Sequence, residues 1–209
     1  RSNILARFRD IGIEIDPVLR RLHQLGPAAG HDGRIVLADT DLGDASWVRT
    51  VPGPGSVDAV VAVQVLHYFP PDRLVDLLTE TRAVLAHDGV LVHVDHVAPD
   101  GTHHLAPSPD PGDPAVADDD ADVGPWLAWW AEARRVEELA SAVGERDRWL
   151  GNGPAVSAEF HPDQRELRAM FARAGLTTLV AERRCGDSLL TIVGPAAVLD
   201  AGHGRREAH

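Results

Sequence analysis

The sequence predicts an α/β fold in which a mostly parallel sheet ends with an antiparallel strand. Through the first half of the chain, short apolar runs alternate with stretches of helical spacing, a pattern typical of parallel strands joined by right-handed crossovers. The run VDAVVAVQVL (57–66) is apolar at nearly every position, which indicates a strand covered by helices on both faces. Later, TTLVAERRC and SLLTIVG flank Gly186-Asp187 and predict a closing β-hairpin.

Capping and turn residues set the expected boundaries of these elements. Asp16 is placed to cap a helix that Pro17 opens, because proline suits the first helical turn. Gly89, after His87-Asp88, is expected to end another helix by adopting a positive φ. In chain order, the sequence predicts the end of a helix at 3–9, a strand at 11–15, a helix at 17–25, a strand at 34–38, a loop at 40–47, a strand at 57–63, a helix at 71–86, a strand at 90–97, helices at 126–150 and 161–175, and strands at 177–185 and 188–194.

Composition changes along the chain and suggests how it is organised. Residues 98–125 are rich in Pro, Gly and Asp, which predicts an irregular insertion with no fold of its own. The expected organisation is a core over 1–97, a flexible loop and helical insertion over 98–160, a helix and hairpin that complete the core over 161–195, and a tail over 196–209.

Charge and cysteine content exclude several classes of function. The 209 residues carry a net charge of −12, which argues against nucleic-acid binding because no basic stripe is available. The single cysteine, Cys185, rules out an internal disulfide and a multi-cysteine zinc cluster. No apolar run approaches the roughly 18–20 residues that span a bilayer, so we expect a cytoplasmic protein without membrane contact. The acidic run DDDAD (118–122) lacks the spacing of a calcium loop and predicts a solvated loop and no metal site.

Four segments, taken in order, resemble class I S-adenosylmethionine-dependent methyltransferases, which have a Rossmann-like fold. GIEIDPVL (12–19) resembles the family's second-strand motif, and ADTDLGDASW (38–47) resembles the loop after its third strand. Residues 57–97 resemble the fourth strand, the helix after it and the fifth strand. Residues 162–194 resemble the last helix and the closing antiparallel strands. The resemblance implies in-line methyl transfer from S-adenosyl-L-methionine to a small-molecule acceptor, for which a secondary metabolite is the suggested class, with S-adenosyl-L-homocysteine as product.

The same resemblance implies a set of cofactor-binding residues. Glu14 would accept hydrogen bonds from the two ribose hydroxyls, and Ile15 would pack on the adenine. A salt bridge from Glu14 to Arg9 or Arg20 is the alternative role for that carboxylate.

Two further stretches would complete the cofactor site. Asp39 and Asp41 compete for the contact with the adenine amino group, with Asp41 favoured and Leu42 offering its amide to the ring. Val63 and Gln64 end the fourth strand of the family pattern, where ligands bind in open α/β sheets, and Gln64 would hold the amino-acid end of the cofactor.

Histidine and aromatic side chains supply the candidates for catalysis and acceptor binding. A general base is needed only if the acceptor is a hydroxyl or a protonated amine, and His67 and His96 are the candidates. His103, His104 and His161 are expected to be exposed loop histidines. Residues 98–160 would form a lid over the acceptor, whose pocket would be lined by Tyr68, Trp129 and Trp130, although packing of this helix over the carboxyl edge of the sheet is the favoured role of the two tryptophans.

One part of the family pattern is missing from the printed chain. The glycine-rich loop after the first strand is absent, and RSNILARF (1–8) resembles the helix that follows such a loop, so we expect upstream residues. Without that strand, an apolar edge at 60–63 would be exposed.

Two other functions remain open at this point. A non-catalytic methyltransferase-like partner subunit would fit the missing loop. A nicotinamide-dependent oxidoreductase is disfavoured, because Tyr68 is the only tyrosine and the chain has no lysine, so that a Tyr-x-x-x-Lys pair cannot form. The acceptor, the atom that is methylated and the oligomeric state, including a homodimer, also stay open.

Overall fold

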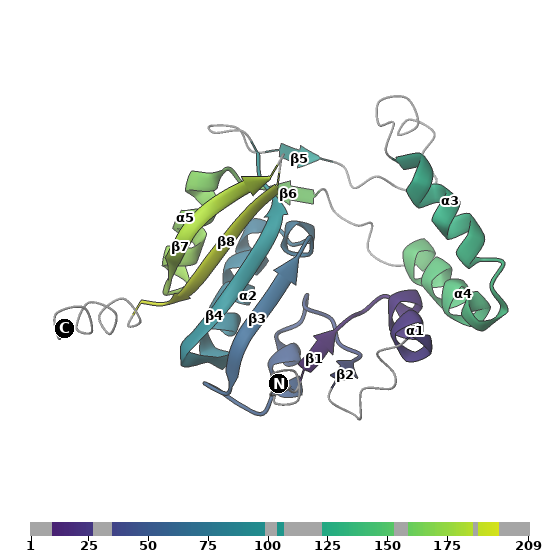
Figure 1. The fold of residues 1–209 in the computed structure, drawn as a ribbon, viewed down its shortest axis with the longest axis horizontal. Helices are drawn as coiled ribbons and strands as arrows, with labels where there is room; N and C mark the ends of the chain where they lie inside the picture. The colour runs from purple at the N-terminus through teal and green to yellow at the C-terminus, as the bar shows by residue number, and fades with distance from the viewer. Residues whose placement is uncertain are drawn as a thin grey trace, which may run out of the picture. The chain divides into compact units, whose positions relative to one another are not determined.

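The computed structural model describes residues 10–26, 35–98, 104–106, 123–152, 159–185 and 188–196 (Figure 1). Two compact units make up the chain. The first contains Arg1–Asp41 and Ser108–Val156, and the second contains Leu42–Pro107 and Ser157–His209. The helix end predicted at 3–9, His103, the acidic run at 118–122 and almost all of the tail lie outside the described residues, as does the side chain of Cys185.

The first unit begins with a parallel strand pair and a capped helix. Strand β1 (Asp10–Ile13) pairs in parallel with β2 (Ile35–Ala38). Helix α1 (Pro17–Leu25) follows β1. The Asp16 side chain accepts a hydrogen bond from the Val18 backbone N–H at 2.8 Å and caps the helix, as the sequence predicted.

The long helix predicted at 126–150 is wrong, because two helices occupy this region. Helix α3 (Val123–Ala133) and helix α4 (Glu137–Asn152) are separated by a short turn. In that turn the Arg135 N–H bonds to the Glu132 carbonyl three residues back, which tightens and ends α3. The break lets both helices contribute to one apolar cluster with α1, so tertiary packing overrides the continuous helical spacing. The cluster consists of Val18, Trp130, Ala133, Leu139 and Val143.

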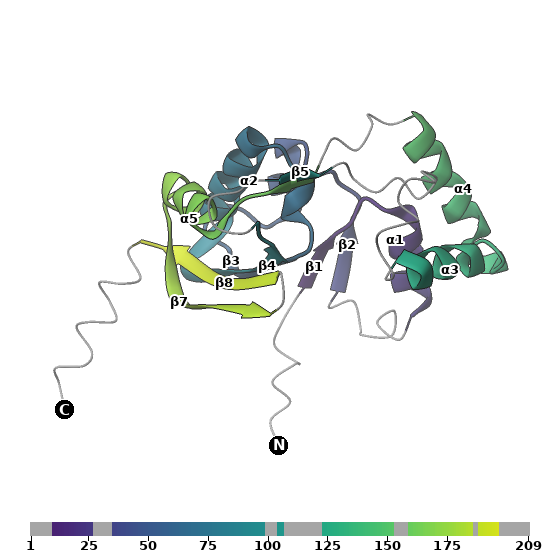
Figure 2. The same cartoon turned by 90° about the horizontal axis from the view of Figure 1, so that it is seen from above.

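The second unit is a four-stranded mixed sheet with helices on one face (Figure 2). Its strand order is β3-β4-β8-β7, with β3 and β4 parallel and the other neighbours antiparallel. The predicted closing hairpin is therefore confirmed. Both helices of this unit cover the same face, and its described helices do not cover the opposite one. The elements are β3 (Val57–Val63), α2 (Pro71–Val84), β4 (Leu85–His96), α5 (Gln164–Arg173), β7 (Leu176–Cys185) and β8 (Ser188–Pro195).

Side chains alternate between the two faces of this sheet. Along β4, Leu91, His93 and Asp95 are buried, whereas the residues between them are partly exposed. His93 packs edge-on against Phe171 of α5, with 5.8 Å between ring centres, which identifies the buried face as the helix-covered one. Two polar residues, His93 and Asp95, thus lie in the core of the unit.

The expected stop at Gly89 is wrong. Helix α2 ends at Val84 and β4 begins at Leu85, so residues 87–89 belong to the strand, and the φ of Gly89 is not positive. A Cβ at Gly89 would lie only 2.8 Å from the Val57 carbonyl oxygen. Glycine is needed here because the two strands approach closely, where their register shifts. The glycine with positive φ that follows a helix is Gly175, at 73°, just after α5.

Short elements replace parts of two predicted irregular regions. The loop predicted at 40–47 runs into a 3-10 helix, η3 (Ala45–Thr50), capped by the Asp44 side chain. The insertion predicted to be irregular contains strand β5 (His104–Ala106), which pairs with β6 (Glu159–His161) in an antiparallel fashion. Helix α5 therefore begins later than predicted. Asp163 caps it through the Glu166 N–H.

Strand β3 is an edge strand of the four-stranded sheet among the described residues. Two of its apolar side chains are exposed, Val61 by 67% and Val63 by 54%, whereas Ala62 between them is buried. The exposure predicted for the stretch 60–63 is therefore found only at alternate residues. The helix cover predicted for both faces of this strand is provided on one face by the described helices of the unit (Figure 2). An uncovered apolar edge is unusual because it invites pairing with another strand.

A partly buried ion pair fastens η3 and the loop before it to α2. Arg73 donates two hydrogen bonds to the Glu80 carboxylate, at 2.7 and 2.8 Å, and a third to the Leu42 carbonyl at 3.0 Å. The Trp47 indole N–H donates to Glu80 at 2.6 Å. Burial raises the pKa of Glu80, but the hydrogen bonds from Arg73 and Trp47 outweigh it and hold the pKa below its ordinary value of 4.5.

Replacing Glu80 by Gln should destabilise the protein by about 1–2 kcal/mol at pH 7, because Arg73 and Trp47 lose a charged acceptor. Folding lowers the pKa of Glu80. The contribution of its carboxylate to the free energy of unfolding is therefore complete above pH 4.5 and is lost as the pH falls below that value. Urea unfolding at pH 7 and near pH 3 measures both effects. Asp76→Asn, on the exposed side of α2, is the control, and an equal loss in that variant would contradict the assignment.

Candidate active site

A buried histidine–carboxylate pair lies at the ends of β3 and β4. His67 comes from the short 3-10 helix η4 (Leu66–Tyr68) that follows β3, and Asp95 comes from β4. The Asp95 Oδ1 lies 2.6 Å from the His67 Nδ1, and the two side chains are only 3% and 5% exposed. The other oxygen, Oδ2, accepts backbone N–H groups of Leu66 and His67 at 3.0 and 3.2 Å. One carboxylate therefore fixes both the imidazole and the turn that carries it.

The charge of Asp95 determines the tautomer of His67. Burial raises the pKa of Asp95, but hydrogen bonds from His67 and His93 outweigh it and hold the pKa well below its ordinary range. The carboxylate is thus ionised and can only accept, so the proton of this contact sits on the His67 Nδ1. The ring nitrogen left to take up a proton is Nε2.

Two further imidazoles and a phenol ring gather around this pair. The ring centre of His67 lies 4.1 Å from that of Tyr68, 5.4 Å from that of His161 and 6.0 Å from that of His96. His161, in β6, also contacts Glu159 through Nε2 at 3.2 Å. A small cavity of about 10 Å³, enough for roughly one water molecule, lies beside the pair and is lined by residues that include Phe160.

Sequence reasoning missed two members of this cluster. His161 was expected to be an exposed loop histidine, and this is wrong, because its side chain is 14% exposed and it belongs to a strand. Two long-range contacts place His161: β6 pairs with β5, some 55 residues away, and the chain just after β6 bridges to the segment after β4 through Ala98 and Asp163. Asp95 could have been found: His93 and Asp95 are polar residues at strand spacing in VHVDH, a signal for a polar pair on a buried face.

Gln64 joins the cluster through a strained backbone. It is the one non-glycine residue with positive φ, 50°, among the described residues. Its backbone N–H bonds to the Val94 carbonyl at 2.8 Å, and its amide Nε2 lies 3.3 Å from the His96 Nε2. Strained residues of this kind persist where the surrounding structure imposes them, often at functional sites. Val63, the neighbouring cofactor candidate, is exposed at the end of β3.

In the first unit, Glu14 and Ile15 form the turn between β1 and α1. The Glu14 Oε1 accepts a hydrogen bond from the Asp16 N–H at 2.8 Å. Arg20, one alternative partner for Glu14, instead pairs with Asp39 and, at 3.6 Å, with Glu145. The other alternative, Arg9, lies outside the described residues.

The two candidates for adenine binding differ in their surroundings. Both carboxylates are exposed, and Asp39 pairs with Arg20, whereas Asp41 lies at the end of the first unit. Leu42, the first residue of the second unit, has its carbonyl held by Arg73. The cofactor candidates Glu14, Ile15 and Asp41 thus belong to one unit, and Leu42, Val63 and Gln64 to the other.

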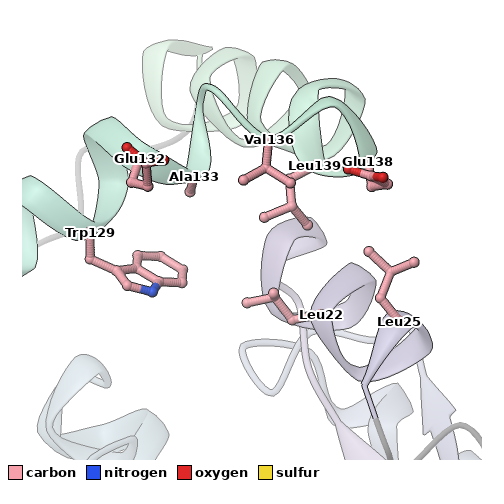
Figure 3. Close-up of a pocket in the computed structure, with 8 residues that line it drawn as sticks. All are labelled: Leu22, Leu25, Trp129, Glu132, Ala133, Val136, Glu138 and Leu139. Carbon is pink, nitrogen blue, oxygen red and sulfur yellow. The ribbon is translucent and has the colours of Figure 1, made fainter.

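Trp129 and Trp130 lie in very different environments. Trp129 is 37% exposed and lines an apolar groove of about 460 Å³ between α1 and the α3–α4 pair (Figure 3). Trp130 is 3% exposed and packs in the apolar cluster of this unit, with the guanidinium carbon of Arg146 3.8 Å above its ring. The groove is lined by Leu22, Leu25, Trp129, Ala133, Val136 and Leu139, with Glu132 and Glu138 beside them.

The described residues lack two other kinds of functional feature. No group of three or more His, Cys, Asp or Glu side chains there is arranged to hold a metal ion. In the same residues, no helix is both long enough and apolar enough to cross a lipid bilayer.

Comparison with known proteins identifies the fold. No protein-family model and no curated protein matches the sequence. Among solved structures, the mitomycin 7-O-methyltransferase MmcR matches 90% of this chain with a TM-score of 0.52 and 17% identity. An O-methyltransferase family 2 protein from Planctomyces limnophilus, in complex with apigenin, matches 91% with a TM-score of 0.53 and 15% identity. The fold is that of class I S-adenosylmethionine-dependent methyltransferases.

A third match extends the comparison to another methyl acceptor. The 1,6-didemethyltoxoflavin-N1-methyltransferase of Burkholderia thailandensis, solved with S-adenosylhomocysteine, matches 88% of this chain with a TM-score of 0.52 and 14% identity. The present chain spans 42% of MmcR, 44% of the Planctomyces protein and 60% of the Burkholderia enzyme. The predicted Rossmann-like α/β fold is confirmed.

Replacing Asp95 by Asn should destabilise the protein by about 3 kcal/mol at pH 7, the cost of breaking a buried charged contact. Folding lowers the pKa of Asp95, so its contribution is complete above the ordinary value of 3.8 and is lost as the pH falls below it. The difference in free energy of unfolding between the wild type and Asp95→Asn should therefore become smaller at acidic pH. Chemical denaturation at pH 7 and pH 3 provides the measurement, with the exposed Asp88→Asn on the same strand as control.

Proposed function

We propose that this chain transfers a methyl group from S-adenosyl-L-methionine to a hydroxyl group of a small-molecule acceptor, of the kind found in secondary metabolism. The observation that carries the proposal is the His67–Asp95 pair, a buried and oriented imidazole at the strand ends of a methyltransferase fold. A hydroxyl must lose its proton as it is methylated, and an imidazole fixed by a carboxylate is suited to accept that proton.

The residues of the chain fit the donor in chemical type. Glu14 offers a carboxylate, already oriented by the Asp16 N–H, to a vicinal diol. Ile15 would lie against the adenine, Asp41 and Leu42 would contact its edge, and Val63 and Gln64 would lie at the methionine end. When bound, S-adenosyl-L-methionine supplies an electrophilic methyl group on a sulfonium.

The chain's own groups would handle the acceptor. His67 takes the hydroxyl proton at Nε2, because its Nδ1 is engaged by Asp95. His96 and His161 pack around that ring and would orient the acceptor oxygen, with Tyr68 on the remaining side. Trp129 and its groove would hold an apolar or aromatic part of the acceptor, and α3 and α4 would belong to the lid. Such a cover excludes water from the reaction.

Calorimetric titration of the full-length protein with S-adenosyl-L-homocysteine tests the donor site. We expect micromolar binding, weakened roughly tenfold to a hundredfold in Glu14→Gln, because the ribose hydroxyls lose a charged acceptor. Asp10→Asn removes the same charge from an exposed position in β1, four residues before Glu14, and should bind normally.

Other outcomes of this titration point to the other two functions. Binding of NADH in place of the homocysteine product would favour an oxidoreductase. Absence of binding to either ligand would contradict the proposal and favour a partner subunit without its own donor site.

Replacing His67 by Gln should lower kcat for a hydroxyl acceptor by roughly 10²–10⁴, the usual contribution of a general base. The affinity for S-adenosyl-L-homocysteine should stay unchanged, because His67 is assigned to the acceptor. A panel of phenolic and aliphatic hydroxyl acceptors, assayed by release of the homocysteine product, provides the measurement. His87→Gln, an exposed histidine of β4, is the control. Unchanged turnover in His67→Gln would show that no base acts at this position.

A further inference from the structure

The turn that carries Glu14 is fastened to a residue far away in the sequence. Glu14 is bonded to the Asp16 N–H at 2.8 Å, and Asp16 uses its two carboxylate oxygens differently. Oδ1 accepts the Val18 N–H at 2.8 Å and caps α1. Oδ2 accepts the Arg146 Nε–H at 2.6 Å, a contact that spans 130 positions in the sequence. All four residues belong to the first compact unit.

Arg146 is itself held firmly. Its side chain and that of Asp16 are 13% and 14% exposed, so the pair is largely withdrawn from water. The guanidinium carbon lies 3.8 Å above the Trp130 ring, and stacking of this kind fixes the plane of the donor fork. Trp130 is 3% exposed and packs beside Val18 in the apolar cluster. The position of Arg146 is therefore set by the packing of α3 and α4 on α1.

Helix capping alone does not account for this arrangement. An N-cap needs one acceptor oxygen, and asparagine serves as well as aspartate. Among the described residues, the second oxygen of Asp16 accepts from Arg146, and its negative charge favours both that contact and the N-terminus of α1. A buried ion pair adds little net stability compared with apolar packing, so its value lies in fixing geometry. The geometry that it fixes is that of Asp16, whose N–H orients the Glu14 carboxylate.

We propose that Arg146 is a positioning residue for the methyl donor, which acts through Asp16 to hold Glu14 in place for the ribose hydroxyls. The inference rests on the proposed function, because it assumes that Glu14 binds the ribose. It makes α3 and α4, assigned to the acceptor lid, part of the donor site as well. Because coupling between sites is reciprocal, donor binding would in turn stabilise the packing of these helices on α1.

The test measures binding of S-adenosyl-L-homocysteine to the full-length protein by calorimetry. Arg146→Met should weaken binding roughly tenfold, within the range typical of coupled sites. Asp16→Asn keeps the helix cap and should weaken binding by a similar factor. The double variant should be no weaker than either single one, because both remove the same contact. Arg134→Met, which breaks the half-exposed pair with Asp147 on the same helices, is the control and should bind normally.

A second experiment separates positioning from a general effect on the fold. In a Glu14→Gln background, adding Arg146→Met should cause no further loss, because the carboxylate that Arg146 positions is already gone. A further tenfold loss in that background, measured by competition calorimetry, would show that Arg146 acts on the unit as a whole and would overturn the proposal. If Arg146→Met does not fold, Asp16→Asn is compared in the same two backgrounds.

The outcomes also separate this inference from the proposed function. Wild-type binding that is weakened by Glu14→Gln but unchanged in Arg146→Met and Asp16→Asn would overturn the inference and leave the proposed function standing. No binding by the wild type would overturn both.

Discussion

The turn and the histidine cluster of the second unit depend on the hydrogen bonds that the ionised carboxylate of Asp95 accepts. It lies in the core face of β4 and accepts the His67 ring and the backbone N–H groups of Leu66, His67 and His96. A buried charge is tolerated only when it is satisfied in this way. The turn after β3, the tautomer of His67 and the grouping of the histidine rings all follow from that requirement.

The first unit uses a second carboxylate in a related manner. Asp16 joins the end of β1, the start of α1 and, through Arg146, the α3–α4 pair. In both units an aspartate organises a turn that carries a candidate functional side chain, His67 in one and Glu14 in the other. The difference lies in the partner: Asp95 acts on a residue of the site directly, whereas Asp16 transmits the position of distant helices.

Local signals in the sequence predicted the elements that depend on local chemistry. The cap at Asp16, the start of α2 near Pro71 and the closing hairpin were all recognised from such signals. Features that depend on distant partners were missed. The turn between α3 and α4 forms because both helices pack on α1. His161 reaches the histidine cluster because β6 pairs with β5 and the residues after β6 bridge to the segment after β4. Periodicity contains no information about either contact. The residues proposed to bind the donor follow from the family resemblance and remain predictions.

The backbone at Gln64 limits which residues this position can accept. A φ of 50° is strongly disfavoured for β-branched residues and is adopted most readily by Gly, Asn and Asp. Of these, glycine has no side chain, and the shorter polar residues do not extend as far toward His96 as glutamine does. Two requirements therefore conflict at position 64. The backbone conformation favours Gly, Asn or Asp, whereas the contact with His96 needs the longer side chain of glutamine. Glutamine makes the contact and accepts the backbone strain. In other sequences with this fold, glutamine directly after the strand that corresponds to β3 would indicate that the contact with the histidine is kept. Glycine or asparagine there would indicate an unstrained turn without that contact.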